Sequence, residues 1–98
     1  MYGTQFALPV KHKDKNRLDI ASNQLAAQLR KSFDSRVLGP EYPAISRIRN
    51  YYHKDILLKI EQKASVKKAK TIIATIIENL QEQKDFRSVR IILDVDPV

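Results

Sequence analysis

Residues 44–61, AISRIRNYYHKDILLKIE, decide how the rest of the chain can fold, because they read as two strands joined by a tight turn. From Ile56 onward every second residue of 52–61 is apolar, which is the period-two pattern of a strand with one buried face. Asn50 sits where the chain must reverse, and asparagine tolerates the left-handed backbone conformation that such turns require. The stretch therefore predicts an antiparallel hairpin with arms at 44–49 and 52–61.

The residues before the hairpin predict a strand, a helix and a broken strand. Apolar residues alternate with polar ones over 5–12, which predicts a half-buried strand. Asn16 is the expected N-cap of the helix, with Asp19 as its capping-box acid. The apolar stripe of this helix comprises Leu18, Ala21, Leu25, Ala26, Leu29 and Phe33. A second strand begins at 36–38 and is interrupted by Gly39-Pro40, which suits a strand at the edge of a sheet.

The residues after the hairpin predict a second helix and a final strand. Ser65 is a suitable N-cap, and the apolar stripe that follows comprises Val66, Ala69, Ile72, Ile73, Ile76, Ile77 and Leu80. Alternating apolar residues from Val89 to Val95 predict a strand that Pro97 ends. The order is therefore βαββαβ, which is typical of a two-layer α+β sandwich with a four-stranded antiparallel sheet and both helices on one face.

Length and composition restrict the class of protein. Ninety-eight residues suit a single domain, 1–98. The absence of cysteine excludes disulfides and thiolate zinc sites, and His12 and His53 alone cannot make a structural zinc site. The longest charge-free apolar run, 71–77, is far shorter than the ~20 residues that span a bilayer. We expect a soluble, cytoplasmic domain with no membrane partner and no cofactor or metal of its own.

The net charge of +7 is concentrated in three segments. Residues 11–17 carry four basic side chains and one acidic one, 44–54 carry three and none, and 59–70 carry five and one. This concentration favours an anionic partner such as nucleic acid, and the alternative is a basic surface that only aids solubility. The topology puts the first two segments at the same end of the sheet, where Lys84 and Arg87 are expected to join them.

The hairpin and the loop after the first strand hold the candidate nucleic-acid-binding residues. These are Arg47, Arg49, Tyr51, Tyr52, His53, Lys54, Lys11, Lys13 and Lys15. Cations contact phosphates, and an exposed tyrosine offers a face on which an unpaired base stacks, worth ~1–3 kcal/mol per base. The alternative is that a tyrosine packs on the core. Alternation predicts that Tyr52 faces inward with Ile56 and Leu58.

Lys67 and Lys68, near the start of the second helix, are candidates for binding a partner. Backbone N–H groups at a helix N-terminus attract anions, so a phosphate or an acidic peptide could dock there. A solvated helix face is the alternative for these lysines.

The sequence offers little for catalysis. The glycine-rich phosphate loops and nucleophile motifs of self-sufficient enzymes are absent, so no catalytic residue is expected. Asp94 and Asp96 would project to one side of the last strand, but a pair alone is a weak signal for a cation site, and we expect no metal.

An ordered set of short motifs runs through the chain. The set is Val37-Leu38-Gly39-Pro40, Pro43, Arg47-Ile48-Arg49, Tyr52, Ile56-Leu57-Leu58-Lys59 and Leu93-Asp94-Val95-Asp96-Pro97. With these motifs the chain resembles the C-terminal domain of primosomal protein N′, the bacterial replication-restart helicase, over essentially all of its length. Two hairpin positions depart from the family: Asn50 stands where a glycine is usual, and His53 where an arginine is usual.

The resemblance implies that the chain is a non-catalytic part of an ATP-dependent 3′-to-5′ DNA helicase, whose ATP, magnesium and zinc sites lie in other domains. It implies binding to branched or single-stranded DNA, contact with the helicase lobes of the same polypeptide, and contact with the acidic tail of single-stranded-DNA-binding protein. The hairpin cluster would then face DNA, and the segment near Lys67 and Lys68 the acidic tail. Two alternatives stay open: an interaction module for acidic protein tails, and a free-standing ribosomal-type RNA-binding domain.

Overall fold

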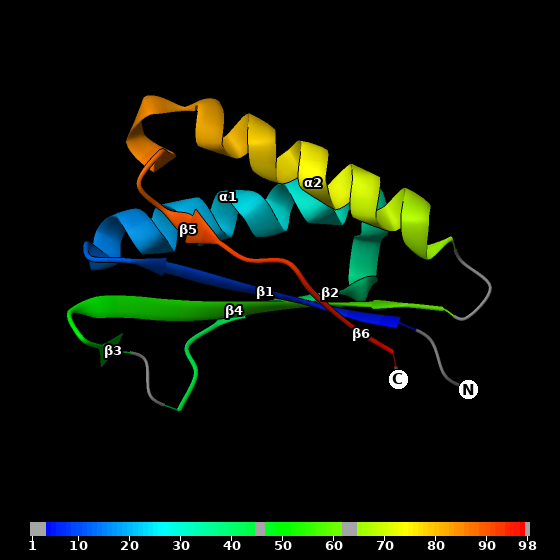
Figure 1. Cartoon of the computed structure of the whole chain (residues 1–98), viewed down its shortest axis with the longest axis horizontal. Coiled ribbons are helices and arrows are strands. Elements are labelled where there is room, and N and C mark those ends of the chain that lie inside the picture. The colour runs from blue at the N-terminus through cyan, green and yellow to red at the C-terminus, as the bar shows by residue number, and fades with distance from the viewer. Residues whose placement is uncertain (1–3, 45–46, 62–64, 98) are drawn as a thin grey trace.

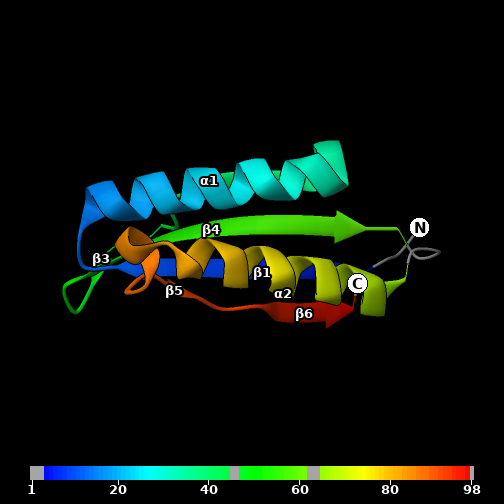
Figure 2. The ribbon, with the colours of Figure 1, turned by 90° about the horizontal axis from the view of Figure 1, so that it is seen from above.

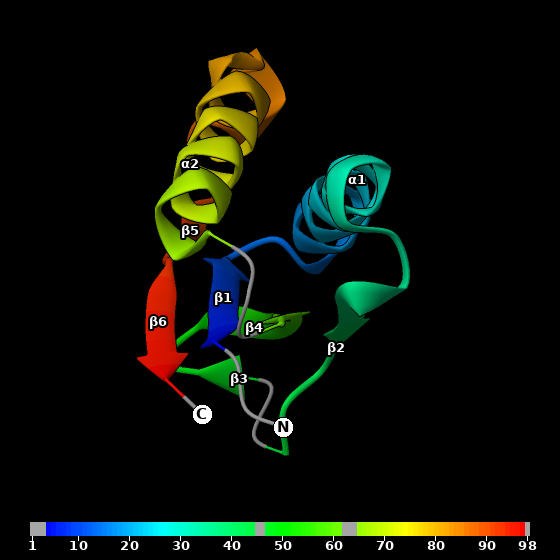
Figure 3. The same ribbon diagram turned by 90° about the vertical axis from the view of Figure 1, so that its right-hand side faces the viewer.

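The computed structural model describes residues 4–44, 47–61 and 65–97. The helices are α1 (Lys15–Phe33) and α2 (Val66–Glu82), with short 3-10 turns η1 (Asp34–Arg36) and η2 (Lys84–Phe86). The strands are β1 (Thr4–His12), β2 (Val37–Glu41), β3 (Arg47–Ile48), β4 (Tyr51–Ile60), β5 (Arg90–Ile91) and β6 (Asp94–Pro97). Both helices lie on the same side of the strand layer (Figures 1 and 3), and the predicted α+β class is confirmed.

Strand β1 lies in the middle of an antiparallel sheet. On one side it pairs with β4 along its whole length, from Thr4 opposite Ile60 to His12 opposite Tyr52. On the other side it pairs with β5 and then β6, while the far side of β4 pairs with β2 and β3. Figure 2 shows β4, β1 and β6 side by side. The end of β1 and the β3–β4 turn therefore meet at one end of the sheet.

The predicted number of four strands was wrong, because two of the predicted strands are each divided in two. The first of these became β2 and β3, and its register against β4 shifts between Leu38 and Glu41. Gly39 lies in this interval with φ +98, and a Cβ there would stand 2.8 Å from the carbonyl oxygen of Asp55. The backbone thus leaves the regular ladder at a glycine that no other residue could replace without strain. Residues 45–46 of the predicted arm lie outside the described residues.

The last predicted strand is divided into β5 and β6 where it passes Pro9 of β1. The carbonyl oxygen of Pro9 faces this strand and accepts a hydrogen bond from the N–H of Ile92 at 3.0 Å. A residue other than proline would present its N–H on the same side of β1, but proline has none. The hydrogen bond that residue 9 would donate to the neighbouring strand is therefore missing, and regular pairing stops between Ile91 and Asp94. A proline inside β1 breaks the neighbouring strand rather than its own.

The local signals at turns and helix starts were confirmed with one exception. Arg49 and Asn50 have φ values of 50 and 70, so the two-residue turn uses the left-handed conformation expected at Asn50. Ser65 caps α2 by accepting a hydrogen bond from the N–H of Lys68. The N-cap of α1 is Asp14 and not Asn16, because the Asp14 carboxylate accepts a bond from the Asn16 N–H at 3.0 Å. The helix begins two residues earlier than predicted.

The core lies between the helices and the inner face of β1 and β4. Its largest fully buried side chains are Phe6, Leu8, Leu18, Leu25, Leu29, Ile56, Leu58 and Ile73. The predicted stripe of α1 is buried from Leu18 to Leu29. Helix α2 buries less of its stripe: Ile76 and Ile77 are half-buried, and Ile72 is exposed. Helix α1 therefore carries most of the helical contribution to the core.

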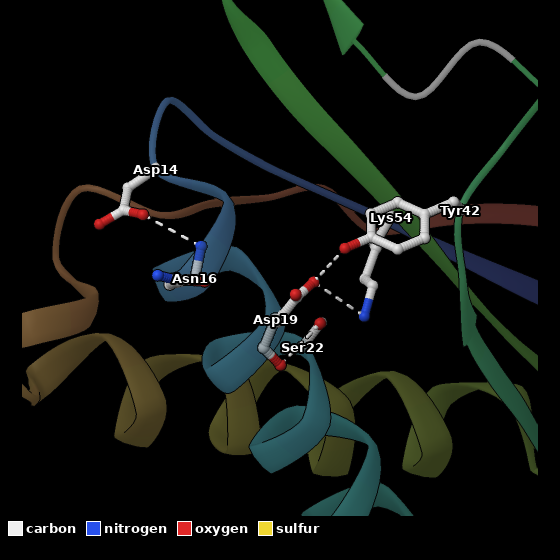
Figure 4. Close-up of polar contacts among 6 residues, drawn as sticks. All are labelled: Asp14, Asn16, Asp19, Ser22, Tyr42 and Lys54. Atoms are coloured by element: carbon white, nitrogen blue, oxygen red, sulfur yellow. Dashed lines mark hydrogen bonds and ion pairs between the residues drawn. The ribbon is translucent and has the colours of Figure 1, made fainter.

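A polar clamp joins α1, β4 and the chain that follows β2 (Figure 4). The ammonium Nζ of Lys54 lies 3.0 Å from Oδ1 of Asp19, and the hydroxyl of Tyr42 donates a hydrogen bond to the same oxygen. The ammonium of Lys54 also lies 4.6 Å from the centre of the Tyr42 ring. Asp19, expected to serve the helix cap, instead neutralises a lysine that is 7% exposed.

The clamp shifts two pKa values in opposite directions. Burial raises the pKa of Asp19, but the hydrogen bonds from Tyr42 and Lys54, together with the positive charges of Lys54 and Lys15, outweigh it and hold the pKa below the usual 3.8. The hydrogen bond to the Asp19 carboxylate is the main reason that the pKa of Tyr42 rises to about 12. Ionised Asp19 and neutral Tyr42 are thus the forms that stabilise the fold.

Replacing Asp19→Asn should lower the free energy of unfolding by about 1–3 kcal/mol at neutral pH, because the ammonium of Lys54 loses its counter-charge. Since the folded state lowers the pKa of Asp19, the difference from wild type in the free energy of unfolding should be complete above pH 3.8. It should disappear as the pH falls through the pKa of Asp19 in the folded state.

Tyr42→Phe should also lower the free energy of unfolding, because the hydrogen bond to Asp19 is lost. This difference from wild type should persist below pH 10 and disappear as the pH rises toward about 12. Urea unfolding at a series of pH values measures both, with the exposed acid variant Glu82→Gln as control. A loss that is independent of pH would contradict the clamp.

Candidate nucleic-acid interface

Three segments that are far apart in sequence meet at the turn end of the sheet, at the left of Figure 1. They are the end of β1, the β3–β4 hairpin and the chain between η2 and β5. Lys11 pairs with His53 on one side and with Arg90 on the other. The expected meeting of the basic segments 11–17 and 44–54 is therefore present, and Arg87 lies with them beside Lys13 and Tyr51.

Alternation along the strands divides the hairpin cluster between two faces. Tyr52 and Lys54 lie on the inner face with Ile56, while Tyr51 and His53 lie on the outer face, which no helix covers. Tyr52 is half-buried against the core, as alternation predicts. Its ring also lies 5.3 Å from the guanidinium carbon of Arg47, its partner across the hairpin. Tyr52 therefore packs on the core, and its ring supports Arg47. The ring of Tyr52 is not an open platform on which a base could stack.

Lys54 does not belong to an exposed binding surface. The sequence placed it with the phosphate-contacting residues, but its side chain points inward and pairs with Asp19. Lys15 is also separated from the cluster, because its ammonium lies over Tyr42, 5.4 Å from the ring centre, beside the clamp. Successive side chains of β4 point to opposite faces of the sheet, so neighbouring hairpin residues cannot all face one ligand.

The cationic group on the outer face is organised around Tyr51, which is half-buried, as is Lys11, while Lys13 is exposed. The ammonium groups of Lys11 and Lys13 lie 5.3 and 5.7 Å from the centre of its ring. Such cation–π contacts are worth about 0.5–1 kcal/mol at exposed sites. Tyr51 therefore gathers two lysines at one place, and Arg49 extends the basic surface at the exposed turn of the hairpin.

A depression of about 420 Å³ opens beside this group. It is lined by His12, Lys13, Tyr51, Arg87, Ser88 and Arg90. The described lining thus holds three cations and no carboxylate. Arg90 and Ser88 were not among the candidate residues, because they lie outside the basic segments of the sequence. His12 lies within segment 11–17 but was not among the candidates either. Arg90 could have been found from its pairing with Lys11, but that pairing is known only once the register of β5 against β1 is known.

His12 and Ser88 make a contact that resembles part of a catalytic dyad. The Nε2 of His12 lies 2.7 Å from Oγ of Ser88, and the backbone N–H of Asp14 donates to Nδ1 at 2.8 Å. A backbone N–H can only donate, so these partners assign the ring proton to Nε2. A general base for a serine nucleophile needs the opposite tautomer, with Nε2 unprotonated. His12 therefore donates to Ser88 and is not arranged to activate it.

A second hollow, of about 230 Å³, lies at the N-terminus of α2. Its lining is mostly apolar, from Phe33, Ile60, Ala69 and Ile72, with Arg36, Glu61, Ser65 and Lys68 at its polar part. Lys68 lies near the start of α2, as the sequence predicts, and it also lies beside an apolar floor. Lys67 is exposed on the same turn but is not part of this lining, and Lys63 lies outside the described residues.

Within the described ranges, no three histidine, cysteine or acidic residues come together as a metal site would require. Asp94 and Asp96 lie opposite Ala7 and Gln5 in the sheet. In the part of the chain that the structure describes, neither helix has the length and apolar character needed to cross a bilayer.

Comparison with known proteins agrees with the family resemblance that the motifs indicate. A family model described as the primosomal protein N C-terminal domain matches residues 2–98. A search of individual curated proteins found no match. Because the family match covers nearly the whole chain, the chain belongs to the family of primosomal protein N C-terminal domains.

Proposed function

We propose that this domain binds nucleic acid at the turn end of its sheet and serves as a non-catalytic accessory domain in replication restart. The observation that carries the proposal is the meeting of cations from three distant segments around Tyr51. The cations are Lys11, Lys13, Arg87 and Arg90, with Arg49 at the hairpin turn and Arg47 on the other face of the hairpin. A surface that only aids solubility does not require cations to converge in this way.

The proposed ligand is branched or single-stranded DNA, held mainly through its phosphates. The cations of this surface match a polyanion, and contacts to phosphates carry no sequence information. Binding of this kind is sensitive to salt and tolerant of sequence, which suits a domain that acts wherever a fork is abandoned. ATP-driven unwinding, and zinc binding, are proposed to belong to other parts of a larger bacterial, cytoplasmic helicase, whose lobes this domain would contact.

Replacing Lys11, Lys13 and Arg90 together by Gln should weaken binding to unrelated single-stranded DNA sequences by similar factors. The slope of log K against log salt should become shallower by about two, since each lost phosphate contact on a single strand contributes about 0.7. Fluorescence anisotropy of labelled oligonucleotides at several salt concentrations measures both.

The matched control replaces Lys31, Lys59 and Lys70, which are exposed and lie outside this cluster, by Gln. It removes the same net charge, so it should change the slope much less. Equal effects of the two triple variants would show that only net charge matters and would refute the interface.

A second candidate function, protein interaction, is favoured by the hollow at the start of α2. An apolar floor beside Lys68 and Arg36 suits a peptide that is acidic and ends in an apolar side chain. Arg36 is already paired with Glu61, so Lys68 is the cation that such a peptide would engage first. The acidic tail of single-stranded-DNA-binding protein is the partner that we propose for it.

Lys68→Glu should weaken binding of such a peptide by at least tenfold, because a favourable charge contact becomes a repulsive one. The control is Lys70→Glu, on the same helix but outside the lining of the hollow. Isothermal titration with the peptide compares the two variants with wild type. Equal losses would indicate a general effect of charge and would exclude a docked peptide at this hollow.

A further inference from the structure

The depression beside β1 contains an arrangement that the proposed function does not by itself require. Its lining brings an oriented hydroxyl, two guanidinium groups and an ammonium group to one place, from Ser88, Arg87, Arg90 and Lys13. A surface that only attracts a polyanion needs charge alone. A hydroxyl that can donate, set among guanidinium and ammonium groups, supplies the donors that a single oxyanion needs.

The orientation of the hydroxyl begins at His12, which is 8% exposed at the end of β1. Its Nδ1 accepts the backbone N–H of Asp14, and the Asp14 carboxylate in turn caps α1 by accepting the N–H of Asn16. The ring is therefore fixed at the junction of β1 and α1. With the proton on Nε2, His12 donates to Oγ of Ser88 at 2.7 Å. The hydroxyl hydrogen of Ser88 is not used in this bond and is available to donate to a bound acceptor.

Two of the three cations in this lining, Lys13 and Arg90, are positioned by other parts of the fold. The ammonium of Lys13 lies against the ring of Tyr51, and Arg90 is placed by the pairing of β5 with β1. Two guanidinium groups with several donors each match the oxygens of a phosphate, and the described lining contributes no carboxylate to oppose it. The volume of about 420 Å³ admits a phosphate together with the sugar attached to it.

We infer that this depression is a phosphate-binding site, in which Ser88, Arg87 and Arg90 hold one phosphate group and His12 acts as the positioning residue for the Ser88 hydroxyl. The inference deepens the proposed function and rests on it for the source of the phosphate, which is one phosphodiester of a bound strand. Free inorganic phosphate shares the same chemistry and is the other source to be distinguished.

The test uses the whole chain and two probes, inorganic phosphate and a short oligothymidine, observed by NMR and by anisotropy. Both probes should shift the Ser88 amide signal, the guanidinium signals of Arg87 and Arg90, and the ring nitrogen signals of His12. Ser88→Ala should weaken oligothymidine binding by about tenfold, as expected for loss of one hydrogen bond to a charged group. Ser88→Thr keeps the hydroxyl and should stay close to wild type.

The role of His12 is tested by His12→Phe, which keeps an aromatic ring but loses both hydrogen bonds. It should weaken binding about as much as Ser88→Ala, and the double variant should be no weaker than either single one, because both act through the same hydroxyl. Additive losses would contradict a positioning role. If His12→Phe does not fold, the comparison of Ser88→Ala with Ser88→Thr still decides the site.

The outcomes separate the site from the proposed function. Wild-type affinity of Ser88→Ala for oligothymidine, with weaker binding by the Lys11, Lys13 and Arg90 triple variant, would overturn the phosphate site and leave the nucleic-acid interface standing. Phosphate shifts at Ser88 without oligothymidine binding would support a site for free phosphate and overturn the proposed function. Absence of both responses would overturn both.

Discussion

The nine-residue pairing of β1 with β4 is the constraint on which the rest of the molecule depends. It places Phe6, Leu8 and Val10 on the same face as Ile56 and Leu58, and this face is the floor of the core. The same register puts the polar end of β1 beside the β3–β4 turn. A shift by one residue would exchange the two faces of β1, so the core and the basic surface are set by one choice of register.

The elements of the fold could be predicted from local patterns. The period of apolar residues indicated both helices and the long strand, and Asn50 indicated the turn, because these signals lie within a few residues of the structure that they specify. The start of α1 was predicted less well. Asn16 and Asp14 are both good caps, and only the chain path out of β1 makes Asp14 the residue whose carboxylate reaches the free N–H of the first turn.

The division of strands and the fate of individual cations could not be predicted from local patterns. Pro9 breaks a partner strand about eighty residues away in the chain, which no local rule can show. The alternation that turns Tyr52 inward also turns Lys54 inward. The partner that neutralises Lys54 there, Asp19, belongs to α1, so the pattern of β4 alone could not predict the ion pair. Arg90 joins the basic group only through the register of β5 against β1. The basic segments of the sequence therefore predicted which loops meet at one end of the sheet, while the pairing of strands decides which of their side chains lie together there.

The interruptions of the sheet have a consequence for the behaviour of the protein in concentrated solution. One border strand, β2, loses register at Gly39, and the other border consists of the two- and four-residue pieces β5 and β6. Neither border offers the long, flat row of unsatisfied N–H and C=O groups that recruits a strand from another molecule. Pro9 and Gly39, which interrupt the regular pairing, thus help to protect the sheet against edge-to-edge polymerisation.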